Sequence, residues 1–492
     1  MTASIVLLGI FLFGMSAIGV WGMRKTKTLN DFFLGGRTVG PWISAFAYGT
    51  TYFSAVIFIG FGGKIGWGYG LKGLAIAAGN AFIGSTAAWL ILARRARRMT
   101  HNLDAMTMPE FLHERFGSKY IKMFAAMIIF VFLIPYSASV FKGLGYLFEA
   151  NFHLKYDYAL LIMIAITGLY LILGGYFAVT LTDFVQGIIM LFGSVVMVVV
   201  LSGKAAETIG ASGIGGAIQA ASERYNQWHS ALPAGKQPSM LMLGALVFMT
   251  SFGVWGMPQM VQKFYAIKNE AVINKAALIT TLFAVVISFA AYYTGALTHV
   301  FYDTLPMGPA GPDFDRVIPE LLTKFLPSGL MAVILLLILS ASMSTLSSLV
   351  LVSASSVAID LYKGHVNPNV SKEKSLVMMR FLSAVFVVVS YFVARYRISF
   401  IVELMSLSWG AVAGAFMAPF FYGLYWKRAT HTGVVAGMIT ALVVNTVLYY
   451  QYGAKNSPIA ASVAMIVPFI VIPLVSFVTK PPSAKIIEKA FA

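Results

Sequence analysis

The sequence predicts an all-α integral membrane protein. Hydrophobic residues make up 59% of its 492 residues, whereas charged residues make up 11%, and the mean hydropathy is +0.81. Apolar runs of about 20 residues recur along the chain, and each is long enough to cross a hydrocarbon core of about 30 Å as a helix. The chain contains no Cys, so disulfides, thiolate metal sites and cysteine nucleophiles are excluded.

The apolar runs form about 13 candidate transmembrane helices. No connection between them is long enough for an independent domain, so we interpret residues 1–492 as a single transmembrane domain. No basic residue precedes the first run, unlike in a cleavable signal peptide, and we interpret this run as a retained helix. The candidate spans are residues 3–23, 41–63, 73–96, 120–148, 157–178, 182–202, 240–262, 274–299, 328–361, 377–394, 399–425, 431–451 and 458–478.

The distribution of basic residues predicts the orientation of the chain. An odd number of spans places the termini on opposite faces, and the face that carries more Lys and Arg is cytoplasmic. With the N-terminus outside and the C-terminus inside, most of the 35 Lys and Arg residues lie in cytoplasmic connections of a protein in the cell (inner) membrane. The net charge of +17 then reflects topology and contact with the lipid bilayer. Nucleic acid is excluded as a partner, since it would require a soluble basic domain.

Two of the spans carry helix-breaking residues. The second contains residues 49–54 (GTTYFS), and the seventh contains residues 253–258 (GVWGMP). Gly and Pro free backbone groups, which a membrane tolerates only where they face protein or a watery cavity. Because the two spans are five apart, the breaks favour two five-helix repeats of inverted topology with a binding site between them. The alternative is that these glycines only allow close helix packing.

The ninth span is unusually rich in hydroxyl groups, over residues 340–356 (SASMSTLSSLVLVSASS). Ser344, Thr345 and Ser348 lie on one helix face, so their oxygens could converge on a small hard cation such as sodium. The alternative is that each hydroxyl bonds to the carbonyl four residues earlier.

Several motifs together resemble those of the sodium:solute symporter family, which includes proline, pantothenate, sugar and sialic acid carriers. The resemblance implies sodium-driven solute uptake and a leucine-transporter-type core with a five-plus-five inverted repeat and discontinuous helices 2 and 7. That core would cover residues 41–425, with the helices at 3–23 and 431–478 peripheral. The motifs are residues 31–37 (DFFLGGR), 174–186 (GGYFAVTLTDFVQ), 343–347 (MSTLS), 360–362 (DLY) and 424–428 (LYWKR).

The resemblance also implies a sodium site. Ser344 and Thr345 match side-chain ligands of the family, and Ala341 matches a carbonyl ligand. Thr50 and Phe53 match carbonyls exposed by the break in the second helix. Sodium bound between a broken helix and a scaffold helix would favour the outward-open state. Five further serines of the ninth helix are expected to serve packing rather than to bind the ion: Ser347, Ser348, Ser353, Ser355 and Ser356.

Asp183 is a further candidate for sodium coupling, because a carboxylate within a membrane span is paired or functional. In the family, an Asp in this Thr-Asp-x-x-Gln setting lies near a second cation position in some members and supports coupling in others. The alternative is a carboxylate near a helix N-terminus, with Thr182 as a capping neighbour. Whether one or two sodium ions are used stays open.

The solute site is expected between the two breaks and the helices that face them. Each candidate there offers a hydrogen bond or an aromatic wall, and freed amides could hold a carboxylate. For Tyr136 and Trp255 ordinary helix packing is the alternative. The candidates are Tyr52, Ser54, Asn80, Tyr136, Phe252 and Trp255.

Lys64 and Lys142 are expected toward the outer face, where they could attract an anion. The alternative is that each reaches to the interface or pairs with an acid.

The motifs are closest to the pantothenate and proline branches. Met257 and Pro258 stand where the sugar branch has an Asn-Gln pair, and Tyr52 stands where the proline branch has an Asp. We therefore expect a small carboxylate-bearing solute: an amino acid such as proline, pantothenate or a monocarboxylate. The alternatives are a proton-coupled symporter of the same fold and a sodium-coupled sugar or sialic acid carrier.

Other classes of function lack their residues in this sequence. A phosphate-binding loop of the type G-x-x-x-x-G-K-[S/T] is missing, which argues against an ATP-driven pump. The seven His residues form no ligand-spaced set, and no enzymatic activity is expected.

Overall fold

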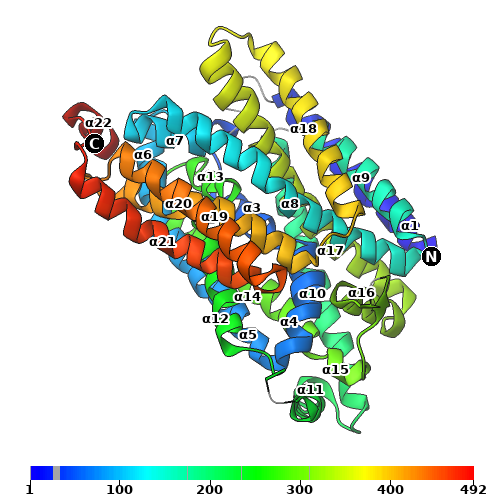
Figure 1. Ribbon diagram of the computed structural model, residues 1–492. Coiled ribbons are helices and arrows are strands. Elements are labelled where there is room, and N and C mark those ends of the chain that lie inside the picture. The colour runs from blue at the N-terminus through cyan, green and yellow to red at the C-terminus, as the bar shows by residue number, and fades with distance from the viewer. Residues whose placement is uncertain (1, 26–33, 174–175, 234, 310) are drawn as a thin grey trace.

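The computed structural model describes residues 2–25, 34–173, 176–233, 235–309 and 311–492. Residues 31–33 and 174–175, which belong to two of the sequence motifs, lie outside the described residues. Helices account for nearly all regular structure in the described part (Figure 1).

The helices of the first half follow the predicted spans. Three π-helical segments, residues Val56–Phe61, Asn80–Ala87 and Trp89–Ala93, continue the second and third spans. The α-helices are α1 (Thr2–Lys25), α3 (Pro41–Tyr52), α4 (Gly62–Tyr69), α5 (Leu74–Gly79), α6 (Arg94–Asn102), α7 (Met108–Phe116), α8 (Lys119–Phe152), α9 (Tyr156–Leu173), α10 (Tyr176–Glu207) and α11 (Gly213–Ala231).

The second half adds one small hairpin of strands β1 (Met307–Gly308) and β2 (Gly311–Pro312), which are antiparallel. A π-helical segment, Ser356–Val366, extends α17. The α-helices are α12 (Met240–Gly253), α13 (Pro258–Tyr265), α14 (Ile273–Ala296), α15 (Thr298–Phe301), α16 (Phe314–Phe325), α17 (Ser328–Ser355), α18 (Lys372–Arg395), α19 (Ile401–Tyr425), α20 (His431–Tyr452), α21 (Ser457–Val478) and α22 (Ala484–Phe491).

Membrane-spanning helices are confirmed as the main element of the fold. Within the described residues, 11 helical stretches are long and apolar enough to cross a membrane. Every candidate span from the sequence overlaps helix, while the exact number of crossings stays a prediction.

Both expected interruptions coincide with the ends of helices. α3 ends at Tyr52, and Phe53 is extended, with φ −110° and ψ 118°. α12 ends at Gly253, and α13 begins at Pro258, whose missing N–H costs nothing at the first position of a helix. A side chain at Gly256 would collide with the backbone of Met417, so the second interruption sits tightly against α19.

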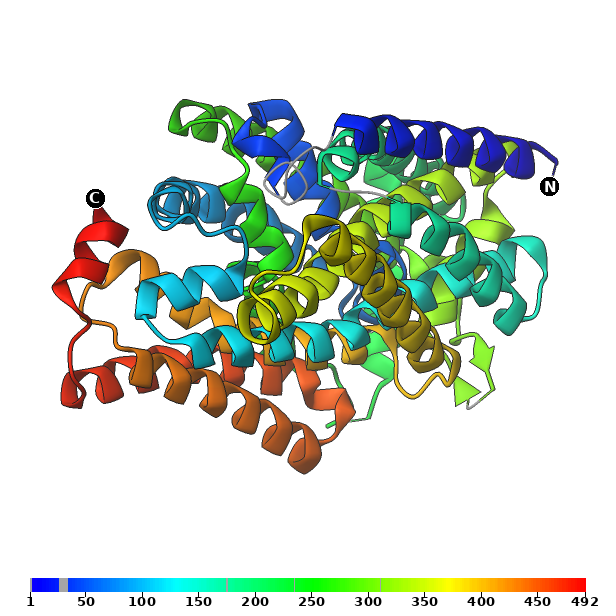
Figure 2. The same cartoon turned by 90° about the horizontal axis from the view of Figure 1, so that it is seen from above.

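The helices differ strongly in burial. In α19, 94% of the residues in its most apolar 18-residue stretch are buried, whereas in α1 the corresponding share is 22%. α20 and α21 pack side by side at one edge of the molecule, with α19 between them and α8, and α1 packs on α10 and α17 at the opposite edge (Figures 1 and 2). α17 contacts α3, α8 and α10, so its hydroxyl-rich face lies inside the protein, where polar groups require partners.

Candidate functional site

The interruption after Tyr52 frees carbonyl groups in the last turn of α3. In a continuous helix the N–H of Ala55 would donate to the carbonyl of Thr51. Here Ala55 N–H donates instead to Ser342 Oγ of α17, at 3.3 Å. The carbonyls of Thr50 and Thr51 are therefore available to groups outside their own helix.

Hydroxyl groups of α17 face these freed carbonyls. Ser344 Oγ lies 2.9 Å from the Thr50 carbonyl oxygen, and Thr345 Oγ1 lies 3.3 Å from the same oxygen. Thr345 Oγ1 also lies 3.2 Å from the Thr51 carbonyl oxygen. The Ala341 carbonyl lies 3.0 Å from Ser344 Oγ and 3.1 Å from Thr345 Oγ1. All five residues are fully buried, so α3 and α17 together present a compact set of oxygens.

Four of the five residues implied for the cage by the resemblance are thus brought together: Thr50, Ala341, Ser344 and Thr345. Phe53 lies at the interruption, where its N–H donates to Gly49 at 3.2 Å, and neither Ser344 nor Thr345 contacts its carbonyl. The Thr51 carbonyl was missed by the sequence analysis. The two hydroxyls also bond back within α17, since Ser344 Oγ lies 3.0 Å from the Ser340 carbonyl.

Asp183 lies on a third helix, α10, and is not one of the oxygens presented by α3 and α17. The alternative of a carboxylate near a helix N-terminus is wrong, because α10 begins at Tyr176, about two turns earlier. Thr182 is not a cap either, since its hydroxyl donates to the Val179 carbonyl at 2.9 Å. Asp183 Oδ2 instead lies 3.5 Å from the Nζ atom of Lys263 in α13.

Lys263 links Asp183 to the oxygens of α3 and α17. Its Nζ donates to Ser348 Oγ at 3.1 Å, and Ser348 Oγ lies 3.0 Å from Thr51 Oγ1. Ser348 therefore contacts a buried ammonium group and a hydroxyl of α3. Ser347, Ser355 and Ser356 bond back to carbonyls of their own helix. That these serines serve packing rather than ion binding stays a prediction. Lys263 was missed because it directly follows the predicted seventh span, residues 240–262, and was counted among the basic residues of the cytoplasmic connections, whereas the structure buries it.

A small cavity of about 20 Å³ lies next to the interruption in α3. Tyr52, Ser54, Asn80 and Tyr136 of the predicted solute residues line it. Tyr52 Oη lies 2.7 Å from the Thr250 carbonyl oxygen and 3.2 Å from Asn80 Oδ1. The sequence analysis missed the other residues that line the cavity: Val56, Ile57, Phe61, Thr250, Tyr292, Met405 and Trp409.

Phe252 and Trp255 do not line this cavity. Trp255 Nε1 donates to the Ile83 carbonyl at 3.2 Å, and its ring packs 5.4 Å from that of Phe252. Trp409 is the indole that lines the cavity, with its ring edge-on to Tyr136 at 5.9 Å.

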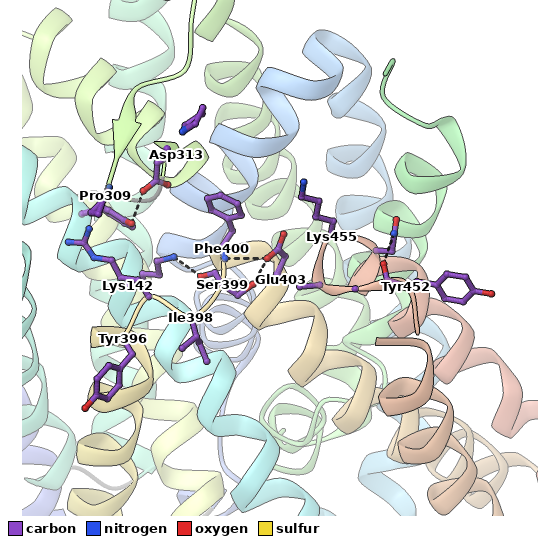
Figure 3. A pocket seen from close by; sticks show the side chains of 17 residues that line it. Lys142, Pro309, Asp313, Tyr396, Ile398, Ser399, Phe400, Glu403, Tyr452 and Lys455 are labelled. Carbon is purple, nitrogen blue, oxygen red and sulfur yellow. Dashed lines mark hydrogen bonds between the residues drawn. The ribbon is translucent and has the colours of Figure 1, made fainter. Parts of the chain in front are cut away.

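Lys64 and Lys142 are both paired with acids, which agrees with the alternative interpretation of these two residues. Lys142 lies 2.9 Å from Asp315, and Lys64 lies 3.1 Å from Glu403. Lys142 also donates to the Ser399 carbonyl at 2.6 Å. Lys142 and Glu403 border a second cavity of about 690 Å³, which Lys455 also lines (Figure 3).

Helices that end beside buried oxygens and a small cavity are typical of the binding sites of secondary transporters. The sequence matches the family model of the sodium:solute symporter family over residues 32–441. The chain therefore belongs to the sodium:solute symporter family, and the resemblance drawn from its motifs is confirmed.

Similar proteins agree with this assignment. The chain is 31% identical to the sodium/proline symporter of Haemophilus influenzae, over 89% of this chain and 87% of that protein. It is 30% identical to the osmoregulated proline transporter OpuE of Bacillus subtilis, over 97% and 95%. A solved sodium-coupled sialic acid symporter in a substrate-bound outward-open state has a TM-score of 0.78 at 18% identity, over 98% of both chains. Inward-facing Mhp1 has a TM-score of 0.54 at 14% identity, over 92% and 95%.

Proposed function

We propose that this symporter imports a small carboxylate-bearing solute together with sodium by alternating access. One observation carries the proposal. The carbonyls of Thr50 and Thr51, which face the hydroxyls of α17, are followed directly by Tyr52, which lines the solute cavity. An ion held by the last turn of α3 would therefore fix the backbone that positions the solute ligand, which couples the two binding events.

The proposed sodium ligands are hydroxyl and carbonyl oxygens, which suit a hard cation. Ser344 and Thr345 supply the side-chain oxygens. Thr50 and Ala341 supply carbonyls, with Phe53 as the further carbonyl that the resemblance implies. Asp183 would act on the cytoplasmic side of this set, through its contact with Lys263.

The lining of the cavity supports a solute with one carboxylate and an apolar body. Tyr52, Ser54 and Tyr136 offer hydroxyl donors, while Trp409 and Phe61 offer apolar walls. Asp, Glu, Lys, Arg and His are absent from the described lining residues. A solute amine would thus meet carbonyl oxygens and aromatic faces rather than a carboxylate.

Proline is the first candidate solute, because the two relatives with about 30% sequence identity named above are proline transporters. Pantothenate and monocarboxylates are the other candidates, since Tyr52 replaces the Asp of the proline branch. The cavity of about 20 Å³ holds about one water molecule. Solute binding therefore requires the lining helices to separate, as alternating access demands.

In the proposed orientation, the N-terminus is outside and the C-terminus is cytoplasmic, in the cell membrane. Residues 41–425 form the transporting core, and the helices near residues 3–23 and 431–478 are peripheral. The low burial of α1 supports the peripheral role of the first helix.

A transport assay in proteoliposomes tests the proposal. Labelled proline, pantothenate and lactate are offered with an inward sodium gradient, an inward proton gradient or neither, at a membrane potential clamped to zero. We expect accumulation of one of these carboxylates with sodium alone. Accumulation driven equally well by protons without sodium would overturn the choice of ion, and sodium-driven uptake of glucose or sialic acid instead would overturn the choice of solute.

A further inference from the structure

Lys263 lies beside the proposed sodium cage, in a position that a second cation would favour. It belongs to α13, the part of the seventh span that follows the interruption, and it is buried to 2% exposure. Its Nζ atom lies 3.5 Å from Asp183 Oδ2 and 3.1 Å from Ser348 Oγ. A carboxylate and a hydroxyl from two other helices thus surround one ammonium group.

The same oxygens have the character of a cation site. Asp183 is fully buried, and its Oδ1 atom has no hydrogen-bond partner among the described residues. Gln186, one turn further along α10 and also fully buried, has neither amide atom hydrogen-bonded within the described part of the chain. Carboxylate, amide and hydroxyl oxygens are the groups that bind hard cations.

This position is connected to the cage by a single hydroxyl contact. Ser348 Oγ lies 3.0 Å from Thr51 Oγ1, and the Thr51 carbonyl oxygen lies 3.2 Å from Thr345 Oγ1 in the cage. An ion leaving the cage would therefore meet Ser348 and Asp183 next, if the ammonium group were not there.

We propose that the Lys263 ammonium group is a built-in cation that occupies the position of a second sodium ion beside Asp183, so that one sodium ion is coupled to each solute. The inference rests on the proposed function and adds its stoichiometry. Two unit positive charges about 4 Å apart repel strongly enough at a typical protein site to lower the affinity for the second by on the order of a thousandfold. A sodium ion therefore cannot share Asp183 with Lys263 at ordinary concentrations.

The stoichiometry of the unmodified protein is the first test. At zero membrane potential, an inward sodium gradient of about tenfold sustains about tenfold accumulation of the solute for one ion and about hundredfold for two. We expect about tenfold accumulation, and one sodium ion bound per chain in equilibrium dialysis with labelled sodium. About hundredfold accumulation, or two bound ions, would overturn the inference but leave the proposed function intact. Absence of any sodium-driven accumulation would overturn both.

Variants of Lys263 form the second test. Lys263→Met removes the charge and retains an apolar stem, so we expect a second sodium ion to bind beside Asp183 and the Hill coefficient for sodium to rise from about one toward two. Lys263→Arg keeps a cation there and should keep one sodium ion. One bound ion in folded Lys263→Met would overturn the inference. If that variant does not fold, the dialysis count on the unmodified protein still decides.

The outer pair of Lys142 and Asp315 supplies a matched control, because it is also a buried ammonium–carboxylate pair. The double variant Lys142→Met with Asp315→Asn removes both charges at once. It should bind one sodium ion, like the unmodified protein. A second ion in this control would mean that loss of any buried charge pair loosens the protein, and would overturn the specific role of Lys263.

Discussion

The hydroxyl of Tyr52 lies 2.7 Å from the carbonyl oxygen of Thr250, so a hydrogen bond joins the two discontinuous helices. Tyr52 is the last residue of α3, and Thr250 lies in the final turn of α12. The same hydroxyl lines the small cavity and lies 3.2 Å from Asn80 Oδ1. The two interruptions are thereby tied together next to the proposed solute site.

Tyr52→Phe removes this link without removing the ring. We expect the affinity for the solute to fall about tenfold or more, and the free energy of unfolding to fall by about 1–3 kcal/mol, because buried acceptors lose their donor. Tyr48→Phe is the matched control, since Tyr48 donates to the Gly84 carbonyl at 2.7 Å and does not line the cavity. Binding of labelled solute and thermal unfolding measure both effects. Equal loss of affinity in the two variants would contradict the assignment of Tyr52.

Thr345→Val, alone or with Ser344→Ala, removes hydroxyls of the proposed sodium cage. We expect the sodium concentration for half-maximal transport to rise about tenfold or more, since each oxygen contributes directly to holding the ion. The maximal rate at saturating sodium should change less. Ser347→Ala is the control, because Ser347 Oγ only bonds back to the Ser344 carbonyl. Unchanged sodium dependence in the double variant would rule out the cage.

Variants of two tryptophans test which residues form the solute site: Trp409, which lines the cavity in the structure, and Trp255, which was expected from the sequence. Trp409→Phe should weaken solute binding severalfold, because Trp409 lines the cavity and packs on Tyr136. Trp255→Phe should leave solute affinity within about twofold, since its indole bonds to Ile83 away from the cavity. The reverse order of effects in a solute-binding assay would favour the original expectation for Trp255.

Gly66→Ala tests the packing of α4, which follows the interruption in the second span. A Cβ atom at Gly66 would collide with the backbone of Gly295 in α14, so we expect a loss of about 1–3 kcal/mol in the free energy of unfolding. Gly68→Ala, two residues away, meets nothing within 4 Å and should be tolerated. Thermal unfolding of the purified variants compares them, and equal stability would contradict the close crossing of α4 and α14.

Lys142→Met should act on stability rather than on solute binding. Loss of Lys142 leaves Asp315 buried without its ammonium partner at 2.9 Å, which costs about 3 kcal/mol. Adding Asp315→Asn should restore much of that loss, and solute affinity should stay unchanged in both variants. A large loss of affinity for an anionic solute in Lys142→Met would instead support attraction of anions by this residue.

The broad organisation was predictable because it depends on local chemistry. Apolar runs must form helices in a bilayer, where every backbone group needs a partner within its own segment. Gly and Pro in the second and seventh spans weaken that pattern: α3 ends at Tyr52, three residues after Gly49, and α12 ends at Gly253. The hydroxyls of Ser344 and Thr345 were also identifiable, since polar groups in a membrane helix are retained for a contact or a ligand.

The sequence by itself therefore determined the membrane fold, the two interruptions, the family and the hydroxyl-rich face of α17. Only the tertiary structure decided which side chains share one site. It brought Lys263 beside Asp183 and Ser348, and Trp409 rather than Trp255 to the cavity. The physical reason is that these contacts join helices far apart in the chain, and periodicity indicates which face of a helix is polar but not which helix that face meets.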